Sequence, residues 1–414
     1  MGQTGNPLRI GLISYRSNPH CGGQGVYIRN LSKALTDLGH HVEVIAGPPD
    51  PLLEQGPKLS CLNTLDLYNP EDLFRTPKAS ELTDPISLLE WLGVSTMGYP
   101  EPATFSLRAF RFLKDRFSDF DVIHDNQCLG YGIWAISRYV PTVATIHHPM
   151  TVDRRLAVQS TRSYLKKLKY LRWYSFIGMQ KRVARKLPRI ITVSAFSRDD
   201  IVRAFGIPAD RFSIVPNGIN MDRFHPLPGI EREPDRLIVT NSADMALKGL
   251  YYLLTAVHRV AQVRPVKLTV IGQPKENGGV ENLVKKLGIG HLITFTGRVS
   301  DEKFLEHYAR ASVAVVPSLY EGFGLPVGEA MACGLPVITT TGGALPEVAG
   351  HAAKLVPPAD ADALSRAIIE LLDSPDLRDT LGAAGYKRIQ EMFTWEQAAI
   401  RTVAAYREVI RAYR

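Results

Sequence analysis

Two glutamates seven residues apart, Glu321 and Glu329, flank a glycine-bearing segment that follows an apolar run. Pro326 suits the first turn of a helix. A helix N-terminus leaves amides unpaired and attracts anions. The amides expected there belong to Phe323, Gly324 and Leu325. Carboxylates beside an anion site are unsuited to phosphate alone, so we interpret them as ligands of hydroxyl groups, one on a sugar and one on a ribose.

A histidine pair lies at another point where an apolar run ends. Taken alone, Lys248 is consistent with an exposed lysine at a helix start. His147 and His148 follow a strand-like run, and adjacent strand residues point to opposite faces. We therefore expect one of the two to reach the site, and we select His147. His124 is equally consistent with a site residue and with a buried core histidine whose ring nitrogens are hydrogen-bonded.

The elements that must position these residues form two series of strands and helices. The first begins with a strand at 8–14, a glycine turn at Gly22-Gly23, a helix ending at Gly39 and a strand at 41–46. The alternative for Gly22-Gly23 is a plain turn without a role in binding. This is the start of a parallel α/β sheet. Its later strands are expected at 122–124, 143–147 and 190–194. The second series has strands at 237–240, 267–271, 293–295, 313–316 and 337–339.

These two series predict two Rossmann-like domains, joined near 226–234. Residues 47–105 are rich in proline and read as an excursion outside the sheet with short helices, and 394–414 reads as helical throughout. The predicted domains are 1–225, 226–394 and a C-terminal helix at 395–414. Ligands of open α/β sheets bind at the carboxyl ends of the strands.

Several motifs in order resemble the large retaining glycosyltransferase family with the Glu-x7-Glu motif, family 4. Beside Glu321 and Glu329, they are Gly22-Gly23, the helix–strand junction at 38–42, the segment 214–220 with Phe224, and the last glycine loop at 342–347. The resemblance covers nearly the whole chain. It implies the GT-B fold, in which two Rossmann-like doubly wound domains face a central cleft and the C-terminal helix packs back on the N-terminal domain.

The resemblance also implies a role for each site residue. Glu329 would bind the donor ribose, and Glu321 would face the transferred sugar near its 3- and 4-hydroxyls. Lys248 would neutralise the diphosphate, Gly23 would approach that diphosphate, and His147 would contact the sugar near the reacting carbon. The loop at Arg298 and Val299 would frame the base. The implied reaction is hexosyl transfer from a nucleotide-sugar with retention, without metal or cofactor.

Two positions depart from the family pattern. Ala243 stands where an arginine is usual, five residues before Lys248, so the leaving group would have one fewer cationic partner. Asn220 stands where an acid is usual. The pair Asp360 and Asp362 resembles a metal-binding Asp-x-Asp, but we interpret it as a helix start.

The charge is concentrated in one segment. The net charge is +8, yet residues 151–190 hold twelve Lys or Arg and one acid, Asp153. Interleaved leucines and aromatics there suit a helix on an anionic membrane. A solvated amphipathic helix and a nucleic-acid patch are the alternatives, and we select the membrane, with no nucleic-acid partner. The acceptor is unidentified, either lipid-linked or soluble and acidic.

Other sequence features narrow the class of protein. There is no apolar run long enough to span a bilayer and no secretory signal. The four cysteines form no CxxC pair, which argues against structural zinc and favours a reducing, cytoplasmic location, including the inner membrane face. The remaining alternatives are a nucleotide-sugar epimerase, a sugar-binding protein that lost catalysis, and a dinucleotide oxidoreductase. The absence of G-x-G-x-x-G after the first strand counts against the last.

Overall fold

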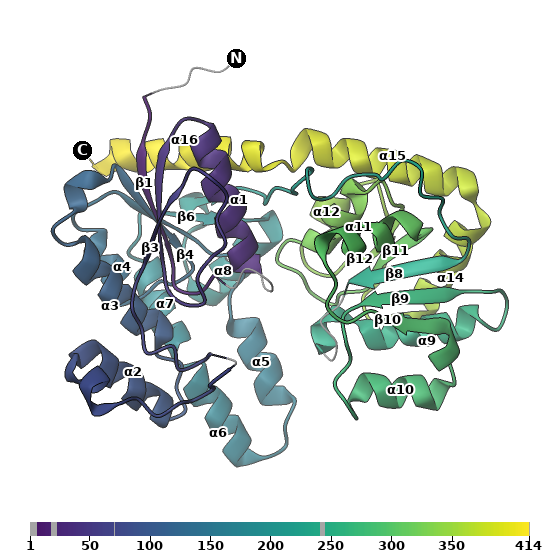
Figure 1. Ribbon diagram of the computed structural model, residues 1–414, viewed down its shortest axis with the longest axis horizontal. Helices are drawn as coiled ribbons and strands as arrows, with labels where there is room; N and C mark the ends of the chain where they lie inside the picture. The colour runs from purple at the N-terminus through teal and green to yellow at the C-terminus, as the bar shows by residue number, and fades with distance from the viewer. Residues whose placement is uncertain (1–5, 18–22, 70, 241–244, 414) are drawn as a thin grey trace. The chain divides into compact units, whose positions relative to one another are not determined.

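The computed structural model describes residues 6–17, 23–69, 71–240 and 245–413, and its chain divides into two compact units (Figure 1). The N-terminal unit comprises 1–193, 197–215 and 395–414. The C-terminal unit comprises 194–196 and 216–394. The last helix is therefore part of the N-terminal unit, although the whole C-terminal unit precedes it in sequence.

The N-terminal unit is built on a seven-stranded parallel sheet with the strand order β3-β2-β1-β4-β5-β6-β7. Its strands are β1 (Arg9–Ser14), β2 (His41–Ala46), β3 (Lys58–Cys61), β4 (Val122–Asn126), β5 (Thr142–Thr145), β6 (Arg189–Thr192) and β7 (Phe212–Ile214). The central strands are buried along nearly their whole length, which explains the apolar runs of β1 and β2. The order of the chain reverses beside β1, and this is where ligands of such sheets bind.

Helices cover both faces of this sheet. They are α1 (Gly23–Asp37), α2 (Pro85–Ser95), α3 (Glu101–Leu113), α4 (Tyr131–Ile136), α5 (Thr151–Gln159), α6 (Tyr164–Trp173), α7 (Phe176–Ala184), α8 (Ala195–Phe205) and α16 (Trp395–Tyr413). Helix α16 packs along α1, and its Trp395, Val403 and Tyr406 belong to the same buried cluster as Leu12 and Leu31. The carboxyl end of the chain thus completes the core of the first unit.

A buried chain of polar contacts ties α16 to the middle of the sheet. The His124 ring contacts the Tyr406 hydroxyl at 2.6 Å through Nδ1 and the Thr145 hydroxyl at 2.7 Å through Nε2. Thr145 also meets the Tyr27 hydroxyl at 3.0 Å. Both ring nitrogens of His124 are occupied, so this residue is a satisfied core histidine.

The C-terminal unit has a six-stranded parallel sheet with the order β10-β9-β8-β11-β12-β13. Its strands are β8 (Arg236–Thr240), β9 (Lys267–Ile271), β10 (Ile293–Phe295), β11 (Val313–Val316), β12 (Val337–Thr340) and β13 (Lys354–Val356). Here the order reverses beside β8, so the loops after β8 and β11 flank the reversal point.

The helices of this unit pack beside the sheet or on one another. They are α9 (Leu250–Val260), α10 (Gly279–Leu287), α11 (Asp301–Arg310), α12 (Leu325–Ala332), α13 (Leu345–Ala349), α14 (Ala361–Asp373) and α15 (Pro375–Met392). Fully buried core residues come from α9 and α14 on one side and from β8, β9 and β11 on the other. Periodicity in the sequence locates these elements because each buries one face.

Several details differ from the sequence-based expectations. The expected strand at 143–147 ends at Thr145, so His147 lies in the turn after β5. Short strands at 58–61, 212–214 and 354–356 were not predicted, since each has only three or four residues. The segment 47–105 contains α2 and the first residues of α3, in agreement with the expected short helices, but β3 within it joins the sheet edge.

Candidate functional site

The loops after β8 and β11 bring Lys248 and Glu321 together. Lys248 ends a short 3₁₀ turn (Ala246–Lys248), and Glu321 lies in the loop that leads into α12. The Lys248 Nζ atom lies 2.6 Å from Glu321 Oε1, and the Ser318 hydroxyl donates to the same oxygen at 2.8 Å. Two residues 73 positions apart in sequence therefore meet at the point where the sheet reverses order.

Glycines allow these loops to approach so closely. A Cβ on Gly249, whose φ is +70°, would lie 1.9 Å from the Pro317 carbonyl oxygen. A Cβ on Gly343, also at φ +70°, would lie 2.2 Å from the Glu321 carbonyl oxygen. Any side chain at either position would push the loops apart. The last glycine loop therefore acts as a support for the backbone of Glu321.

The N-terminus of α12 lies directly after this loop, as expected. No described residue accepts a hydrogen bond from the amides of Phe323, Gly324 or Leu325. The Phe323 side chain is buried and packs edge-on against Phe393 at 5.8 Å. Phe323 can therefore contribute its amide to an anion site, while its ring belongs to the core.

Glu329 is a half-buried carboxylate in the second turn of α12. Burial raises the pKa of Glu329 to about 7, against the lowering effects of the Arg223 and Lys248 charges. Loss of hydration disfavours the charged form. Glu329 is thus divided between its acid and carboxylate forms near neutral pH, which the sequence did not indicate.

Arg223 is a cation near Glu329 that sequence reasoning missed. Its Nη2 pairs with Asp301 Oδ1 at 2.6 Å, whereas its buried Nε has no hydrogen-bond partner among the described residues. The Asn220 side-chain oxygen accepts from the amides of Asp222 and Arg223, both at 3.1 Å. An amide oxygen here does what a carboxylate would do, which explains how Asn220 replaces the usual acid.

In the N-terminal unit, His147 is held by the end of β4. Its Nε2 lies 2.8 Å from Asn126 Oδ1, and its backbone amide donates to the Gln127 side chain at 2.8 Å. Burial lowers the pKa of His147 to about 3, with a smaller effect from His148, so the ring is neutral at pH 7. Because the Asn126 oxygen only accepts, Nε2 carries the proton and Nδ1 is an acceptor.

The neighbouring side chains separate the two adjacent histidines. Tyr27 packs edge-on against the His147 ring at 4.8 Å. His148 instead faces Asp153 on α5, at 3.4 Å. His147 is therefore the histidine held at the carboxyl edge of the sheet. Asn126 and Gln127 were not singled out from sequence, although their position at the end of a buried strand could have indicated them.

The remaining predicted residues are more dispersed. Gly23 is the exposed first residue of α1, and a Cβ there would meet nothing within 4 Å. Arg298 is exposed and Val299 half-buried in the loop after β10. Gly22 and Ala243 lie outside the described residues. The structure therefore gathers Lys248, Glu321 and the α12 amides, and leaves the roles of Gly23, Arg298 and Val299 as predictions.

The described residues form neither a metal-binding cluster nor a membrane-spanning helix. They contain no group of three or more His, Cys, Asp or Glu side chains placed to hold a metal ion. Asp360 caps α14 by accepting from the Ala363 amide at 2.8 Å, as predicted. Within the same ranges, no helix combines the length and apolarity needed to cross a bilayer.

The fold and the loops match known glycosyltransferases. The sequence model described as Glycosyltransferase Family 4 matches residues 21–223, and that described as Glycosyl transferases group 1 matches residues 228–388. A sucrose-phosphate synthase from Thermosynechococcus elongatus has a TM-score of 0.75 at 25% identity, over 98% of this chain and 100% of that one. Anabaena HepE in complex with UDP-glucose has a TM-score of 0.68 at 16% identity, over 97% and 100%.

A curated relative is considerably more similar in sequence. It is the MMP alpha-(1->4)-mannosyltransferase of Mycolicibacterium hassiacum, which is 46% identical over 408 residues, covering 97% of this chain and 98% of that protein. With the two family matches and the GT-B fold, this similarity over the full length shows that the chain is a glycosyltransferase and belongs to glycosyltransferase family 4.

Proposed function

We propose that this enzyme transfers a mannosyl residue from a nucleoside-diphosphate mannose to the 4-hydroxyl of an acceptor saccharide, with retention of configuration. The observation that carries the proposal is the pairing of Lys248 with Glu321 beside the open amides of α12. Lys248 and the amides suit a diphosphate, and the Glu321 carboxylate suits sugar hydroxyls. The mannosyltransferase relative at 46% identity supports mannose as the sugar and the 4-hydroxyl as the acceptor group.

In the proposed reaction the acceptor oxygen forms a bond to the anomeric carbon as the bond from that carbon to the diphosphate breaks. The electron pair leaves on the diphosphate, and the acceptor proton passes to the departing phosphate oxygen. Lys248 and the amides of Phe323, Gly324 and Leu325 would stabilise the charge that builds on the leaving group. A cation and fixed dipoles suit this task because they need no reorganisation during the reaction.

The remaining site residues would bind the hydroxyl groups and the base of the donor. Glu321 would accept hydrogen bonds from the 3- and 4-hydroxyls of the sugar, and Glu329 from the ribose. The neutral His147 ring would accept from a sugar hydroxyl through Nδ1, since its Nε2 is engaged by Asn126. The loop at 298–299 would frame the base. That a protein of the same fold was crystallised with UDP-glucose is compatible with such a donor.

Incubating the protein with mannose donors of different bases, and with other nucleotide-sugars, tests the proposal. We expect release of free nucleoside diphosphate from one mannose donor when a mannosaccharide acceptor is present. NMR of the product should show an α-linkage. A donor of another hexose that turns over in preference to every mannose donor would refute the choice of sugar. Conversion of the donor to an isomer without transfer would instead favour the epimerase alternative, which the comparisons do not support.

We also propose that the reaction needs no metal. Activity should persist in EDTA, because a lysine and helix-terminal amides can take over the leaving-group charge that a divalent cation would neutralise. Loss of activity on chelation that Mg²⁺ or Mn²⁺ restores would contradict this. The chelator should be removed in a parallel sample, so that direct inhibition by EDTA is distinguished from metal loss.

The location of the acceptor forms the last part of the proposal. Part of the basic segment is engaged internally, since α7 and the residues after it bind neighbouring groups: Lys181 contacts the Ala204 carbonyl, Arg185 the Phe205 carbonyl and Arg189 the Glu408 carboxylate. The cations of α6 stay on the surface. We therefore propose that α6 attaches the enzyme reversibly to the cytoplasmic face of an anionic membrane, with a soluble acidic acceptor as the alternative.

A further inference from the structure

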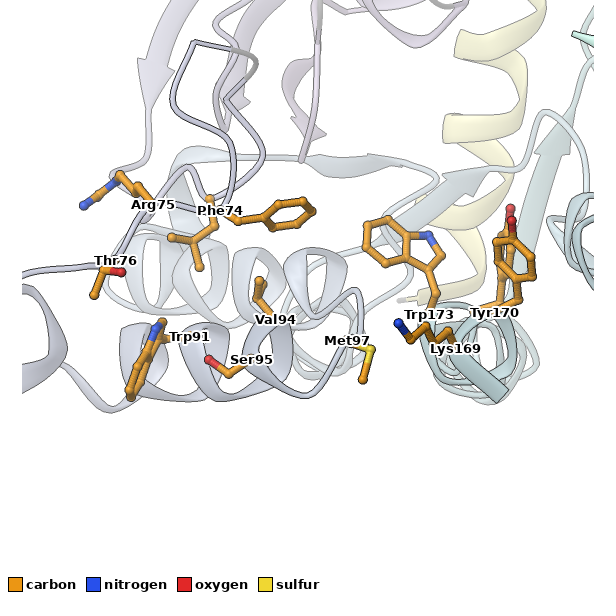
Figure 2. Close-up of a pocket in the computed structure, with 12 residues that line it drawn as sticks. Phe74, Arg75, Thr76, Trp91, Val94, Ser95, Met97, Lys169, Tyr170 and Trp173 are labelled. Carbon is orange, nitrogen blue, oxygen red and sulfur yellow. The ribbon is translucent and has the colours of Figure 1, made fainter. Parts of the chain in front are cut away.

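A cavity of about 680 Å³ lies in the N-terminal unit between α2, the loop at 67–76 and α6 (Figure 2). Trp91 and Val94 line it from α2, Phe74 from the loop, and Trp173 from α6, with Tyr174 just after that helix. The cavity is built only from residues of this unit and is separate from the surroundings of His147. No residue assigned above to transfer chemistry lines it.

The chemistry of the wall favours a hydrocarbon over a saccharide. None of the described residues around the cavity carries a carboxylate or a carboxamide, the groups that would pair with the many hydroxyls of a sugar. The one guanidinium, that of Arg75, is already bound to Glu81 and to the Leu65 carbonyl. Most of the lining is aromatic or aliphatic, and an unpaired hydroxyl placed there would lose its hydration without compensation.

The two helices that line the cavity also expose apolar side chains to solvent. Helix α2 exposes Leu88, Leu89 and Leu92, and Leu89 is 50% exposed. Helix α6 exposes Leu165, Leu168 and Leu171, and Leu165 is 70% exposed. Figure 2 shows that both helices contribute to the same cavity. Several exposed apolar side chains on two helices that share a cavity are typical of an interaction surface.

The same helix supplies positive charge. Lys166 and Lys169 are exposed on α6 between its leucines, and Lys169 also lines the cavity. Helix α6 contains no acidic residue. Leucines that enter the acyl region, next to lysines that meet anionic headgroups, are the arrangement of an interfacial helix. Charge complementarity therefore selects an anionic bilayer among the surfaces that could cover this face.

The walls are held in place by contacts behind the cavity. Trp173 stacks on Tyr99 with ring centroids 5.1 Å apart, and Tyr68 packs edge-on against Trp173 at 5.6 Å. Arg172 ties α6 to the end of α2 through the Thr96 hydroxyl at 2.7 Å. A preformed cavity loses less entropy on binding than one that must be assembled.

We propose that the face formed by α2 and α6 docks on an anionic bilayer and that the cavity takes up one hydrocarbon chain of a lipid. The inference rests on the membrane attachment proposed above but is independent of the transfer chemistry. It adds a second helix, α2, and a chain-binding site to the α6 contact. The ligand class is an anionic amphiphile with an extended alkyl chain.

Tryptophan fluorescence tests chain entry directly, because two of the four tryptophans of the chain, Trp91 and Trp173, line the cavity. Vesicles of phosphatidylglycerol brominated along the acyl chains quench tryptophans that a chain touches. We expect quenching of the wild-type protein and none in Trp91→Phe/Trp173→Phe, with unbrominated vesicles as the reference. Quenching that persists in the double variant would come from Trp134 or Trp395 and would overturn the proposal.

A second pair of variants separates the cavity from the surface charge. Val94→Asp places a charge in the cavity wall, and Thr83→Asp places the same charge at an exposed position outside it. We expect vesicle affinity to fall by about tenfold or more in Val94→Asp, because each buried methylene contributes to lipid binding, and to change little in Thr83→Asp. Equal losses, or none, would overturn chain uptake. Circular dichroism and donor turnover verify that both variants fold.

The charge contribution has its own matched control. Replacing Lys166, Lys167 and Lys169 by Gln should abolish binding to anionic vesicles, and high salt should do the same. Arg172 stays unchanged because it holds α2 to α6. The same replacement at Lys267, Lys285 and Lys286, which are exposed in the C-terminal unit, should leave binding intact. If the wild type ignores anionic vesicles at low salt, the docking proposal fails, whereas donor turnover still reports the transferase proposal.

Two other occupants of the surface would give different results. A second copy of the chain would produce a dimer in sedimentation velocity that Val94→Asp dissociates, and this outcome would overturn the lipid proposal. A saccharide would protect Trp91 and Trp173 from acrylamide quenching, whereas soluble fatty acid would not, and this too would overturn it. Protection by a long-chain fatty acid, and by no saccharide, supports the proposal.

Discussion

Lys248 and Glu321 form an ion pair in which the lysine nitrogen lies 2.6 Å from one carboxylate oxygen. That same oxygen also accepts from Ser318, so the two donors share one atom of the carboxylate. No described residue hydrogen-bonds Oε2 of Glu321, which leaves this oxygen for hydroxyl groups. Before a donor binds, the charges of Lys248 and Glu321 stabilise each other. When a donor binds, its diphosphate would become the partner of Lys248 and its sugar hydroxyls the partners of Glu321.

Replacing Lys248 by Ala should lower turnover by about 100-fold or more, because negative charge builds on the diphosphate in the transition state. Steady-state kinetics with the mannose donor measures this, and Lys285→Ala, an exposed lysine of the same unit, serves as the control. The thermal midpoint should change little, since Ser318 still hydrogen-bonds Glu321. A loss of tenfold or less would mean that other groups stabilise the leaving group.

Donor binding should depend on pH through Glu329. With a pKa of about 7, this carboxyl is mostly protonated at pH 6, and an uncharged carboxyl is the poorer acceptor for two ribose hydroxyls. As the pH rises toward 7, the wild-type dissociation constant should decrease by up to about tenfold per pH unit, and it should level off above pH 7. Calorimetric titration between pH 5.5 and 8.5 measures this dependence.

Glu329→Gln should remove that pH dependence and bind the donor more weakly than the wild type at pH 8, by about 1.5–3 kcal/mol, the free energy of a hydrogen bond to a charged group. At pH 6 the variant and the wild type should nearly agree. An equal difference at both pH values would show that the charge of Glu329 is not what binds the ribose.

Gly23→Ala isolates the predicted approach of a diphosphate to the start of α1. A Cβ at this position meets no protein atom within 4 Å, so the thermal midpoint should be unchanged or slightly raised, since alanine favours helix. Turnover should nevertheless fall by about tenfold or more if the donor lies against this residue. Gly178→Ala is a suitable control, because its Cβ also meets nothing. Full activity in Gly23→Ala would remove Gly23 from the site.

Asp125 predicts a pH effect on stability that is independent of catalysis. Burial raises the pKa of Asp125 to about 7, although the Leu129 and Cys128 amides act against this. Its Oδ1 is buried without a hydrogen-bond partner among the described residues. The folded state thus retains a proton that the unfolded state releases above its ordinary pKa near 4. The free energy of unfolding contributed by this group therefore falls as pH rises from about 4 to 7.

Asp125→Asn should remove this loss, because the amide carries no charge and its oxygen can still accept from the Leu129 amide. The thermal midpoint of the variant, relative to the wild type, should rise between pH 5 and pH 8. Asp119→Asn, at an exposed position, should show no such trend. A difference that stays constant with pH would mean that Asp125 is ionised in the folded state throughout.

Local sequence patterns predicted most strands of both sheets and the two glutamates of the candidate site. Strand-length apolar runs are easy to recognise when both faces are buried, as in β1 and β11, whereas β3, β7 and β13 are too short to produce a pattern. Glu321 and Glu329 were found because their spacing and glycines lie in one continuous segment. Lys248 was found only through the family resemblance, since nothing local shows that it meets Glu321.

The residues that were missed depend on long-range contacts. The alternation of side chains along a strand could not distinguish His147 from His148, because β5 ends before both residues. The distinction depends on Asn126, which belongs to another strand. Arg223 acts on Glu329 from 106 positions away in sequence. The basic segment looked like one surface helix, yet it contains three, and contacts with Ala204, Phe205 and Glu408 engage part of its charge.

The position of α16 in the N-terminal core has a consequence for biosynthesis. The last twenty residues supply Tyr406 to His124 and Trp395 to Tyr27, so the first unit to be translated is the last that can complete its core. The C-terminal unit needs almost only the continuous segment 216–394 and can fold as soon as that segment leaves the ribosome. Until α16 has been synthesised, the nascent N-terminal sheet exposes the apolar side chains that α16 will cover, and this is the interval in which a chaperone would be needed.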